Sequence, residues 1–201
     1  MKGVKPIVHV IAGANGSGKS TFAQEYLLQM QRYPSFINAD LIALGLSPYN
    51  PEAVKVTAGK LVLQRIQGFL KKRESFGFET TLSGTAYRRL LKILGARGFE
   101  VRLCYLWVRQ VKLAIKRIKD RVKRGGHDVP EPDVRRRYLR SLRNFHSYAR
   151  LADRVLVFDN SGYPPRLVAK GERGNLRPVE PKLFAQFIDQ VRKNQHENPR
   201  K

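Results

Sequence analysis

One short segment combines the residue types that hold the phosphates of a nucleotide. Residues 13–21, GANGSGKST, fit the pattern G-x-x-x-x-G-K-[ST]. Glycines let the backbone turn tightly so that successive N–H groups point at phosphate oxygens. Lys19 supplies a positive charge to the β- and γ-phosphates, and the Ser20 hydroxyl is a ligand for Mg²⁺. The predicted ATP and Mg²⁺ site comprises Gly13, Ala14, Asn15, Gly16, Ser17, Gly18, Lys19, Ser20 and Thr21.

An aspartate follows the second apolar run of the chain. Residues 35–39, SFINA, have the composition of a short strand, and Asp40 ends it. In open parallel α/β sheets, ligands bind beyond the carboxyl ends of the strands. A carboxylate there can accept the proton of an attacking hydroxyl group, as the catalytic aspartate of kinases does. Asp40 is therefore the candidate catalytic base and a candidate substrate contact. The alternative is that Asp40 caps a short helix over residues 41–44.

Polar residues also interrupt the third apolar run, residues 76–82. Glu79, Thr80 and Thr81 lie within it. A carboxylate in a strand that is covered on both faces carries a large desolvation cost unless it is paired. We therefore expect this strand to reach the site, where Glu79 holds substrate hydroxyls or a metal-bound water and one of the threonines donates a hydrogen bond. The alternative is an exposed edge position.

A basic segment joins two amphipathic helices through a Gly-Gly hinge. Residues 121–138, RVKRGGHDVPEPDVRRRY, combine a loose loop with clustered arginines. Arginine makes bidentate contacts to phosphoryl oxygens and keeps its charge, so this segment fits a lid over the phosphates. Arg124 and Arg136 are the candidate catalytic arginines, and Arg124 and Arg137 are the candidate ATP contacts. His127 is a candidate general acid or phosphate contact, with a polar turn residue as the alternative.

The sequence leaves the remainder of the Mg²⁺ site open. The fourth apolar run ends at Arg109 without the acidic residue that NTPases commonly have there. Asp159, at the end of the fifth run, is a further candidate, and Ser20 is the one metal ligand predicted from the motif.

These residues need a scaffold that brings the ends of several strands together. Strand-like and helix-like periodicities alternate along the chain, which predicts an α/β P-loop kinase fold: a parallel sheet of about five strands flanked by helices, with a basic helical lid. The predicted strands are residues 7–12, 35–39, 76–82, 101–108 and 154–159. We expect one P-loop kinase-like domain over residues 1–194 and a frayed polar tail over residues 195–201.

Composition narrows the class of protein and its partners. The chain has 201 residues and one cysteine, Cys104, which we expect to be a packed thiol in a reducing compartment. Neither a secretory signal nor an apolar run of about 18 residues is evident, so we expect a cytoplasmic protein without a membrane span. The formal net charge of +23 favours polyanionic partners: nucleotides, nucleic acid or an acidic protein.

Together these segments resemble the zeta toxin family of small P-loop phosphotransferases. The matching pieces, in order, are GANGSGKST, FINADLIA, FGFETTLSG, RGGHDVPEPDVRRRYLRSLRNF and ADRVLVFDNSG. The resemblance implies an ATP-dependent kinase with Asp40 as base, Lys19 on the phosphates, and lid arginines best matched by Arg124 with Arg136 or Arg137. It also implies an antitoxin protein as partner and a UDP-activated amino sugar as acceptor. The chain is shorter and more basic than the resemblance requires, which leaves the acceptor open.

Two other functions fit the same residues. A polynucleotide or RNA-end kinase would use the same phosphate loop and aspartate, and it would account for the high positive charge; however, aromatic residues are not interleaved with the basic run as a base-stacking surface would need. A nucleotide-binding regulator without turnover is the third interpretation, although the pair of carboxylates Asp40 and Glu79 suits acid–base chemistry.

Overall fold

The computed structural model describes residues 5–28 and 35–196 as seven strands, seven α-helices and one 3-10 helix. The strands are β1 (Ile7–Ala12), β2 (Ser35–Ile37), β3 (Phe76–Thr80), β4 (Glu100–Trp107), β5 (Arg154–Asp159), β6 (Arg166–Glu172) and β7 (Asn175–Pro178). The helices are α1 (Lys19–Leu28), α2 (Ala39–Leu46), η1 (Pro51–Val54), α3 (Lys55–Lys72), α4 (Ala86–Ala96), α5 (Val111–Lys123), α6 (Glu131–Ala149) and α7 (Pro181–His196).

The strands form one sheet in the order β2-β3-β1-β4-β5-β6-β7. The first five are mutually parallel, which confirms the predicted parallel sheet of five strands. Residues 166–179 add β6 and β7, which extend the sheet as an antiparallel edge. Because β1 pairs with β3 on one side and β4 on the other, its carboxyl end lies between theirs, with Ala12 opposite both Thr80 and Tyr105. This is the position at which parallel α/β sheets bind ligands.

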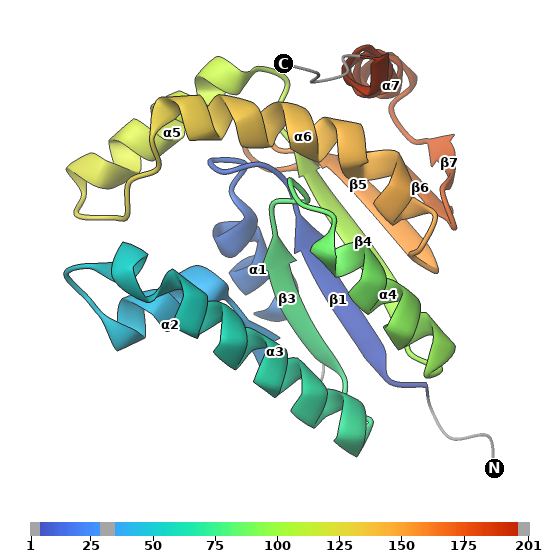
Figure 1. Cartoon of the computed structure of the whole chain (residues 1–201). Coiled ribbons are helices and arrows are strands. Elements are labelled where there is room, and N and C mark those ends of the chain that lie inside the picture. Colours follow the sequence, from blue (N-terminus) through green and yellow to red (C-terminus); the bar gives the residue numbers. More distant parts are fainter. Residues whose placement is uncertain (1–4, 29–34, 197–201) are drawn as a thin grey trace.

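The helices cover both faces of the sheet and one end of it. Figure 1 shows α4 and α6 in front of the sheet and α1 behind it. Helices α5 and α6 extend over the carboxyl ends of the strands, α2 lies on the other side of the same end, and α3 runs from there along β3 toward the start of that strand. The helical pair predicted as a basic lid, α5 and α6, is therefore positioned beside the phosphate loop.

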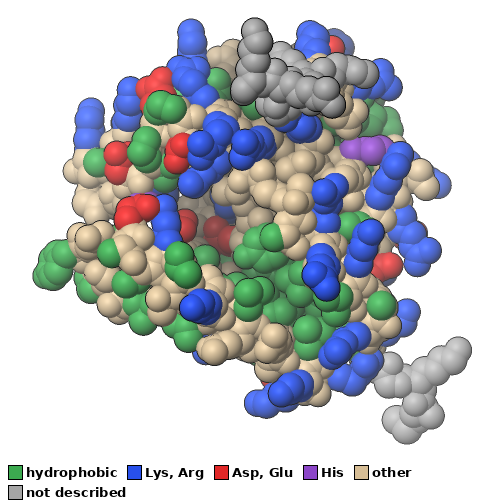
Figure 2. Space-filling model, in the orientation of Figure 1, with side chains coloured by type: hydrophobic (Ala, Val, Ile, Leu, Met, Phe, Trp, Pro, Cys, Tyr) green, Lys and Arg blue, Asp and Glu red, His purple; other side chains and the backbone are tan. Residues whose placement is uncertain are grey.

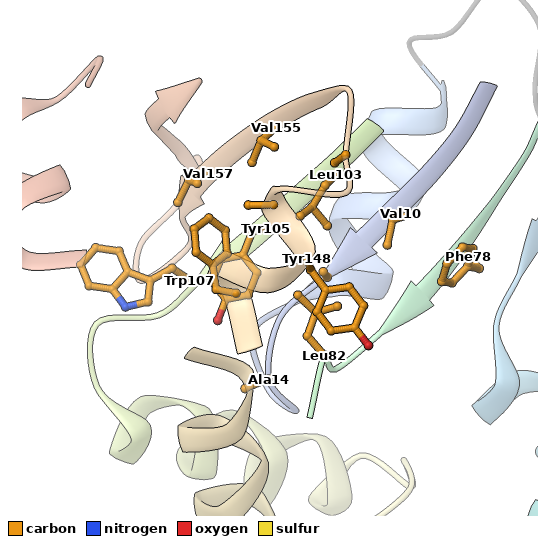
Figure 3. Packing of buried hydrophobic residues seen from close by; sticks show 14 of the residues in the cluster. Val10, Ala14, Phe78, Leu82, Leu103, Tyr105, Trp107, Tyr148, Val155 and Val157 are labelled. Atoms are coloured by element: carbon orange, nitrogen blue, oxygen red, sulfur yellow. The ribbon is translucent and has the colours of Figure 1, made fainter. Parts of the chain in front are cut away.

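The larger part of the hydrophobic core lies between the sheet and α3, α4, α6 and α7. Alternate residues of β4 point into it, and Figure 3 shows Leu103, Tyr105 and Trp107 on this side, near Tyr148 of α6. The Tyr105 ring packs against Phe145 with centroids 4.8 Å apart. This packing fixes α6, and with it the arginines of its first half, relative to the strand ends.

The opposite face of the sheet holds a smaller cluster around α1. It contains Cys104, which is buried as predicted; burial raises the pKa of its thiol to about 12. His9 on β1 is also buried, and desolvation lowers the pKa of its imidazole to about 4. In the described part of the chain, no helix combines the length and apolarity needed to cross a bilayer.

Several boundaries differ from the prediction: β3 ends at Thr80 rather than at residue 82, and β4 spans Glu100–Trp107 rather than residues 101–108. Strand β2 ends at Ile37 because the side chain of Asn38 accepts hydrogen bonds from the next backbone N–H groups and starts α2 there. Helix α7 continues to His196, so the first two residues of the predicted tail are helical, and residues 197–201 lie outside the described residues. The apolar spacing after the phosphate loop predicts a first helix that ends near Met30, and this end lies outside the described residues.

Candidate active site

The phosphate loop lies between β1 and α1 and adopts a conformation that depends on glycine. Gly16 and Gly18 have φ angles of 76° and 84°, in the left-handed region that residues with a Cβ rarely adopt. A Cβ on Gly16 would lie 2.3 Å from the carbonyl oxygen of Ala114 in α5. The loop is therefore packed directly against the first turn of α5, so its backbone position depends on that helix.

Residues at the ends of β3 and β5 hold this loop in place. The Gly13 N–H donates to the carbonyl of Thr80, at the end of β3, over 3.2 Å. On the other side, Asn160, which follows β5, donates from Nδ2 to the carbonyl of Ser17 over 2.7 Å. Arg117 of α5 in turn donates to the carbonyl of Asn160 over 2.8 Å. The loop geometry thus depends on β3, β5 and α5 together, and Asn160 is a positioning residue that the sequence motif did not indicate.

Lys19 is the charged residue at the centre of the site. Its Nζ donates to the carbonyl of Ala14, across the loop, over 2.9 Å. Burial lowers the pKa of the ammonium group; the carboxylates of Glu79 and Asp40 oppose this shift, and the charges of Arg121 and Arg137 add to it. Lys19 therefore lies within the electrostatic reach of two carboxylates and two arginines. This is the environment expected for a lysine that neutralises phosphate charge.

Glu79 joins three segments of the site. Its Oε2 accepts from the Ser20 hydroxyl over 3.0 Å, and its Oε1 accepts from Asn38 Nδ2 over 3.1 Å. Desolvation raises the pKa of the Glu79 carboxyl, while Lys19 and the Ser20 hydrogen bond oppose the rise. The carboxylate is thus half-buried and paired rather than at an exposed edge, as we expected for a strand that reaches the site. Asn38 is a further contact, and its signal in the sequence was the preference of asparagine for the start of a helix.

Asp40 lies in the first turn of α2 and faces the same cavity. The helix cap is Asn38, whose Oδ1 accepts from the Asp40 and Leu41 N–H groups over 2.9 and 3.1 Å. The alternative interpretation of Asp40 as an N-cap is therefore wrong, because α2 begins two residues earlier than predicted. The Asp40 carboxylate lines the cavity with Glu79 and Lys19. Since its side chain is exposed, it is accessible to an incoming acceptor.

Three arginines line the cavity from α5 and α6. They are Arg117 and Arg121 of α5, one helical turn apart, and Arg137 of α6. Arg137 Nη1 donates to Asn15 Oδ1 over 3.4 Å, which connects α6 to the phosphate loop. Arg121 Nη2 donates to the carbonyl of His127 over 2.5 Å, which holds the loop between the two helices. The sequence feature that could have identified Arg117 and Arg121 as a pair is their i, i+4 spacing within a helix.

Two predicted arginines do not reach this cavity. Arg124 is the residue that caps α5, and it lines an adjoining smaller cavity of about 310 Å³. Arg136 is exposed and pairs with Asp133 over 2.9 Å. One position along a helix rotates a side chain by about 100°, so Arg136 and Arg137 cannot face the same ligand. The expectation that Arg124 and Arg136 lie over the phosphates is therefore not met in this structure.

The other two titratable candidates, His127 and Asp159, form ion pairs with residues that do not line this cavity. His127 lies 3.3 Å from Glu52 of η1, so it links the α5–α6 loop to the opposite side of the cleft. Asp159 is 2% exposed, pairs with Arg109 over 3.1 Å and accepts from the Ser161 N–H over 3.0 Å. Asp159 does not line the cavity, which removes it as a metal ligand.

The cavity has a volume of about 790 Å³. Its lining includes residues of the phosphate loop, the carboxylates of Asp40 and Glu79, and the three arginines of α5 and α6. In Figure 2 it is the hollow below α5 and α6, with acidic side chains in its depth and basic side chains along its upper rim. Thr80, Thr81 and Tyr87 also line the cavity, and Tyr163 lies at its mouth with 85% of its surface exposed. Thr80 and Thr81 are already hydrogen-bonded, to the Leu82 N–H and the Ser83 hydroxyl.

The described residues supply only some of the ligands that a divalent metal ion needs. No group of three or more His, Cys, Asp or Glu side chains suited to a metal occurs among residues 5–28 and 35–196. The Ser20 hydroxyl and the Glu79 carboxylate, 3.0 Å apart, are two candidate oxygen ligands beside Lys19, and the Asp40 carboxylate lines the same cavity. Mg²⁺ is commonly held by one or two such groups together with phosphates and waters, so this donor set fits Mg²⁺ bound with a nucleotide.

Comparisons with known sequences identify one family. Residues 1–164 match the sequence model of the family described as Zeta toxin. A Haemophilus influenzae protein described as uncharacterized is 35% identical over 126 residues, which cover 63% of this chain and 88% of that protein.

Comparisons of structure give the same fold at low identity. A chain of the AvrRxo1-ORF1:-ORF2 complex with ATP superposes with a TM-score of 0.70 and 16% identity, covering 92% of this chain and 64% of that one, so this chain spans less than two thirds of its length. A chain of the PezAT chromosomal toxin-antitoxin system of Streptococcus pneumoniae has a TM-score of 0.64 and 15% identity, covering 98% and 90%. A chain of the Pnkp1/Rnl/Hen1 RNA repair complex has a TM-score of 0.54 and 22% identity, covering 70% and 45%.

Proposed function

Because this chain belongs to the zeta toxin family, we propose that it is a kinase that transfers the γ-phosphoryl group of ATP to a hydroxyl group of a small molecule. The observation that carries this proposal is the single cavity in which the phosphate loop, the carboxylate of Asp40 and three arginines meet. A phosphate cradle alone would suit any nucleotide-binding protein. The exposed carboxylate beside it is what transfer to a hydroxyl additionally needs.

In this proposal the phosphate loop and Lys19 bind the triphosphate of ATP. The loop amides and the Lys19 ammonium surround the β- and γ-phosphates, and Arg137, held against Asn15 of the loop, closes them from α6. Ser20 and Glu79 hold Mg²⁺, which when bound neutralises charge on the phosphates. Tyr163 at the cavity mouth offers an aromatic face to the nucleobase.

Asp40 acts as the base toward the acceptor. The acceptor oxygen attacks the γ-phosphorus as its proton passes to the Asp40 carboxylate. The bond between the γ-phosphorus and the bridging oxygen breaks, and ADP leaves with that electron pair. Arg121 and Arg137 stabilise negative charge on the transferring group, because both lie within electrostatic reach of Lys19. Glu79, Thr80 and Thr81, which line the same cavity, orient the acceptor.

The acceptor we propose first is a UDP-activated amino sugar, which rests on family membership. The likeness to a chain of a toxin-antitoxin system supports an antitoxin-like protein as a regulatory partner. The second candidate is the 5′-hydroxyl end of a polynucleotide. The net charge of +23 and the likeness to a chain of an RNA repair complex favour that second acceptor.

One experiment distinguishes the two acceptors. Purified protein is incubated with γ-labelled ATP and Mg²⁺, in parallel with UDP-N-acetylglucosamine and with a 5′-hydroxyl oligonucleotide. Label on the sugar nucleotide supports the first acceptor, and label on the oligonucleotide supports the second. Transfer to neither, or transfer that persists undiminished in Asp40→Asn, contradicts the proposed reaction.

A further inference from the structure

A second groove lies between α4 and the carboxyl-terminal end of α6, outside the active-site cavity. It has a volume of about 570 Å³. Its lining includes four cations, Arg88, Arg89, Lys92 and Arg150, and the hydroxyl groups of Thr85 and Ser147. We refer to it as the α4–α6 groove. The proposed kinase reaction uses none of these side chains.

The four cations have no counter-charge within the described part of the chain. None of them forms an ion pair or a side-chain hydrogen bond there. Helix α4 contains no acidic residue, and neither does the stretch from 134 to 152 that includes the end of α6. The next carboxylate along the chain is Asp153. It accepts a hydrogen bond from the Val101 N–H over 3.0 Å and pairs with Arg173 over 3.5 Å.

The arrangement of these cations concentrates positive charge. On α4, Arg88 and Arg89 lie four and three residues before Lys92, so they share one helical face, and like charges at such spacings repel. Arg150 adds its charge from α6, where it also contributes, after desolvation, to lowering the pKa of the nearby His146. A bound polyanion would relieve this repulsion, whereas a single small anion would reach only part of the groove.

A second basic groove provides a contrast. It lies over β4 to β7 and includes Arg102 and Arg154, but both guanidinium groups pair with Glu100, over 2.8 and 3.0 Å. Part of the positive charge is therefore offset there, although Lys170 and Arg177 of the same groove form no ion pair among the described residues. In the α4–α6 groove, none of the four cations is paired. Figure 2 shows lysine and arginine side chains gathered on the right of the molecule, over α4 and the end of α6.

We propose that the α4–α6 groove binds the phosphodiester backbone of a nucleic acid. Arginine and lysine side chains with neighbouring hydroxyl groups are the usual donors to phosphodiester oxygens. The groove lining contains no aromatic residue, so base stacking does not contribute and binding is independent of sequence. The protein's charge of +23 steers such a polyanion to its surface. This binding function requires no phosphoryl transfer, so it stands apart from the proposed reaction.

The test measures binding of a fluorescently labelled single-stranded RNA to the full chain without ATP. Because each neutralised phosphate contributes about 0.7 to the slope of log affinity against log salt, affinity should fall steeply with salt. The variant Arg89→Glu/Lys92→Glu/Arg150→Glu should weaken binding at least about tenfold and reduce that slope by about 2. Its circular dichroism spectrum and ATP binding should match those of the wild type, since all three side chains lie outside the active-site cavity.

A matched control removes the same charge elsewhere. Lys60→Glu/Arg65→Glu/Lys182→Glu alters three exposed cations of α3 and α7, and it should retain RNA affinity within about threefold if binding is local. An equal loss in both triple variants would overturn the proposal, because net charge alone would then explain binding. Loss in Arg121→Glu but not in the groove variant would also overturn it, since the RNA would then occupy the active-site cavity. Binding of a polyglutamate peptide with greater affinity than RNA would assign the groove to acidic proteins instead.

Discussion

The Ser20 hydroxyl donates to Glu79 over 3.0 Å, which joins the first turn of α1 to the end of β3. These two residues are 59 positions apart in the chain, and the parallel pairing of β1 with β3 brings them together. The glutamate would be costly to bury alone, yet Ser20, Asn38 and the charge of Lys19 surround it. The predicted phosphate loop and the predicted polar strand end are thus parts of one site.

The Glu79 carboxylate should reduce the stability of the folded protein at neutral pH. Its pKa is raised, mainly by desolvation, so the ionised form is less favoured in the folded state than in the unfolded chain. The contribution of this group to the free energy of unfolding is therefore largest below the ordinary glutamate pKa of about 4.3. It is lost as pH rises through the pKa of the folded state. Glu79→Gln should therefore raise the melting temperature at pH 7.5 and lower the rate of phosphoryl transfer.

The pH dependence separates this effect from an unrelated change in packing. The gain in melting temperature of Glu79→Gln should shrink when both proteins are measured at pH 4.5, where the wild-type carboxyl approaches protonation. Thr81→Val, at a neighbouring polar position of the same cavity, provides a control without a titrating group. A gain for Glu79→Gln that is the same at both pH values would contradict the electrostatic explanation.

Lys19 and Asp40 should have separable roles. Lys19→Ala removes the charge beside the phosphate loop, so we expect ATP affinity to fall at least about tenfold and transfer to be lost. Asp40→Asn keeps the shape and removes the base, so transfer should fall about 100-fold or more while ATP affinity changes less than about threefold. Isothermal titration calorimetry with ATP and a labelled-phosphate assay measure the two effects. Equal loss of ATP binding in both variants would refute the division of roles.

The arginines inside and outside the cavity should differ sharply in their effects on transfer. Arg121→Gln and Arg137→Gln remove charge that lines the cavity, and each should lower kcat/KM at least about 100-fold. Arg124→Gln and Arg136→Gln serve as matched controls from the same helices, and each should stay within about threefold of the wild type. Steady-state kinetics with varied ATP gives these ratios. A strong loss in either control would mean that the lid moves during the reaction.

The sequence predicted the scaffold well because its signals are local. The apolar runs 7–12 and 154–159 coincide with β1 and β5, and the glycine pattern predicted the loop that follows β1. The end of β2 was placed too late because SFINA was interpreted as one strand up to Ala39, whereas the hydrogen bonds of Asn38 decide where α2 begins. Capping depends on a side-chain geometry that composition alone does not determine.

The choice among arginines could not be made from the sequence. Arg121, Arg124, Arg136 and Arg137 are equally suited to phosphate, and the lid segment contains all of them. Which of them faces the cavity depends on the rotation of α5 and α6 about their axes, and that rotation is set by core contacts such as Tyr105 with Phe145. The role of Asn160 at the phosphate loop likewise depends on the pairing of β4 with β5, a contact between distant segments.

His9 should make the protein sensitive to acid. Its pKa falls from an ordinary value of 6.5 to about 4 because it is buried on β1, with Arg102 adding to the shift. The unfolded chain therefore binds a proton first as pH falls, so stability is present above pH 6.5 and is lost between about pH 6.5 and 4. The loss attributable to this group is of the order of 3 kcal/mol at most. His9→Gln, which cannot take up the proton, should lose less stability over this range.

Chemical denaturation at several pH values tests the acid sensitivity of His9 directly. The relevant quantity is the difference in free energy of unfolding between wild type and His9→Gln, because carboxylates elsewhere titrate equally in both proteins. Lowering the pH from 7 to 4.5 should decrease the free energy of unfolding of the wild type more than that of His9→Gln. His146→Gln is the matched control: His146 is less buried than His9, so its difference should vary less with pH. A His9→Gln difference that is constant with pH would show that the buried imidazole does not limit stability in acid.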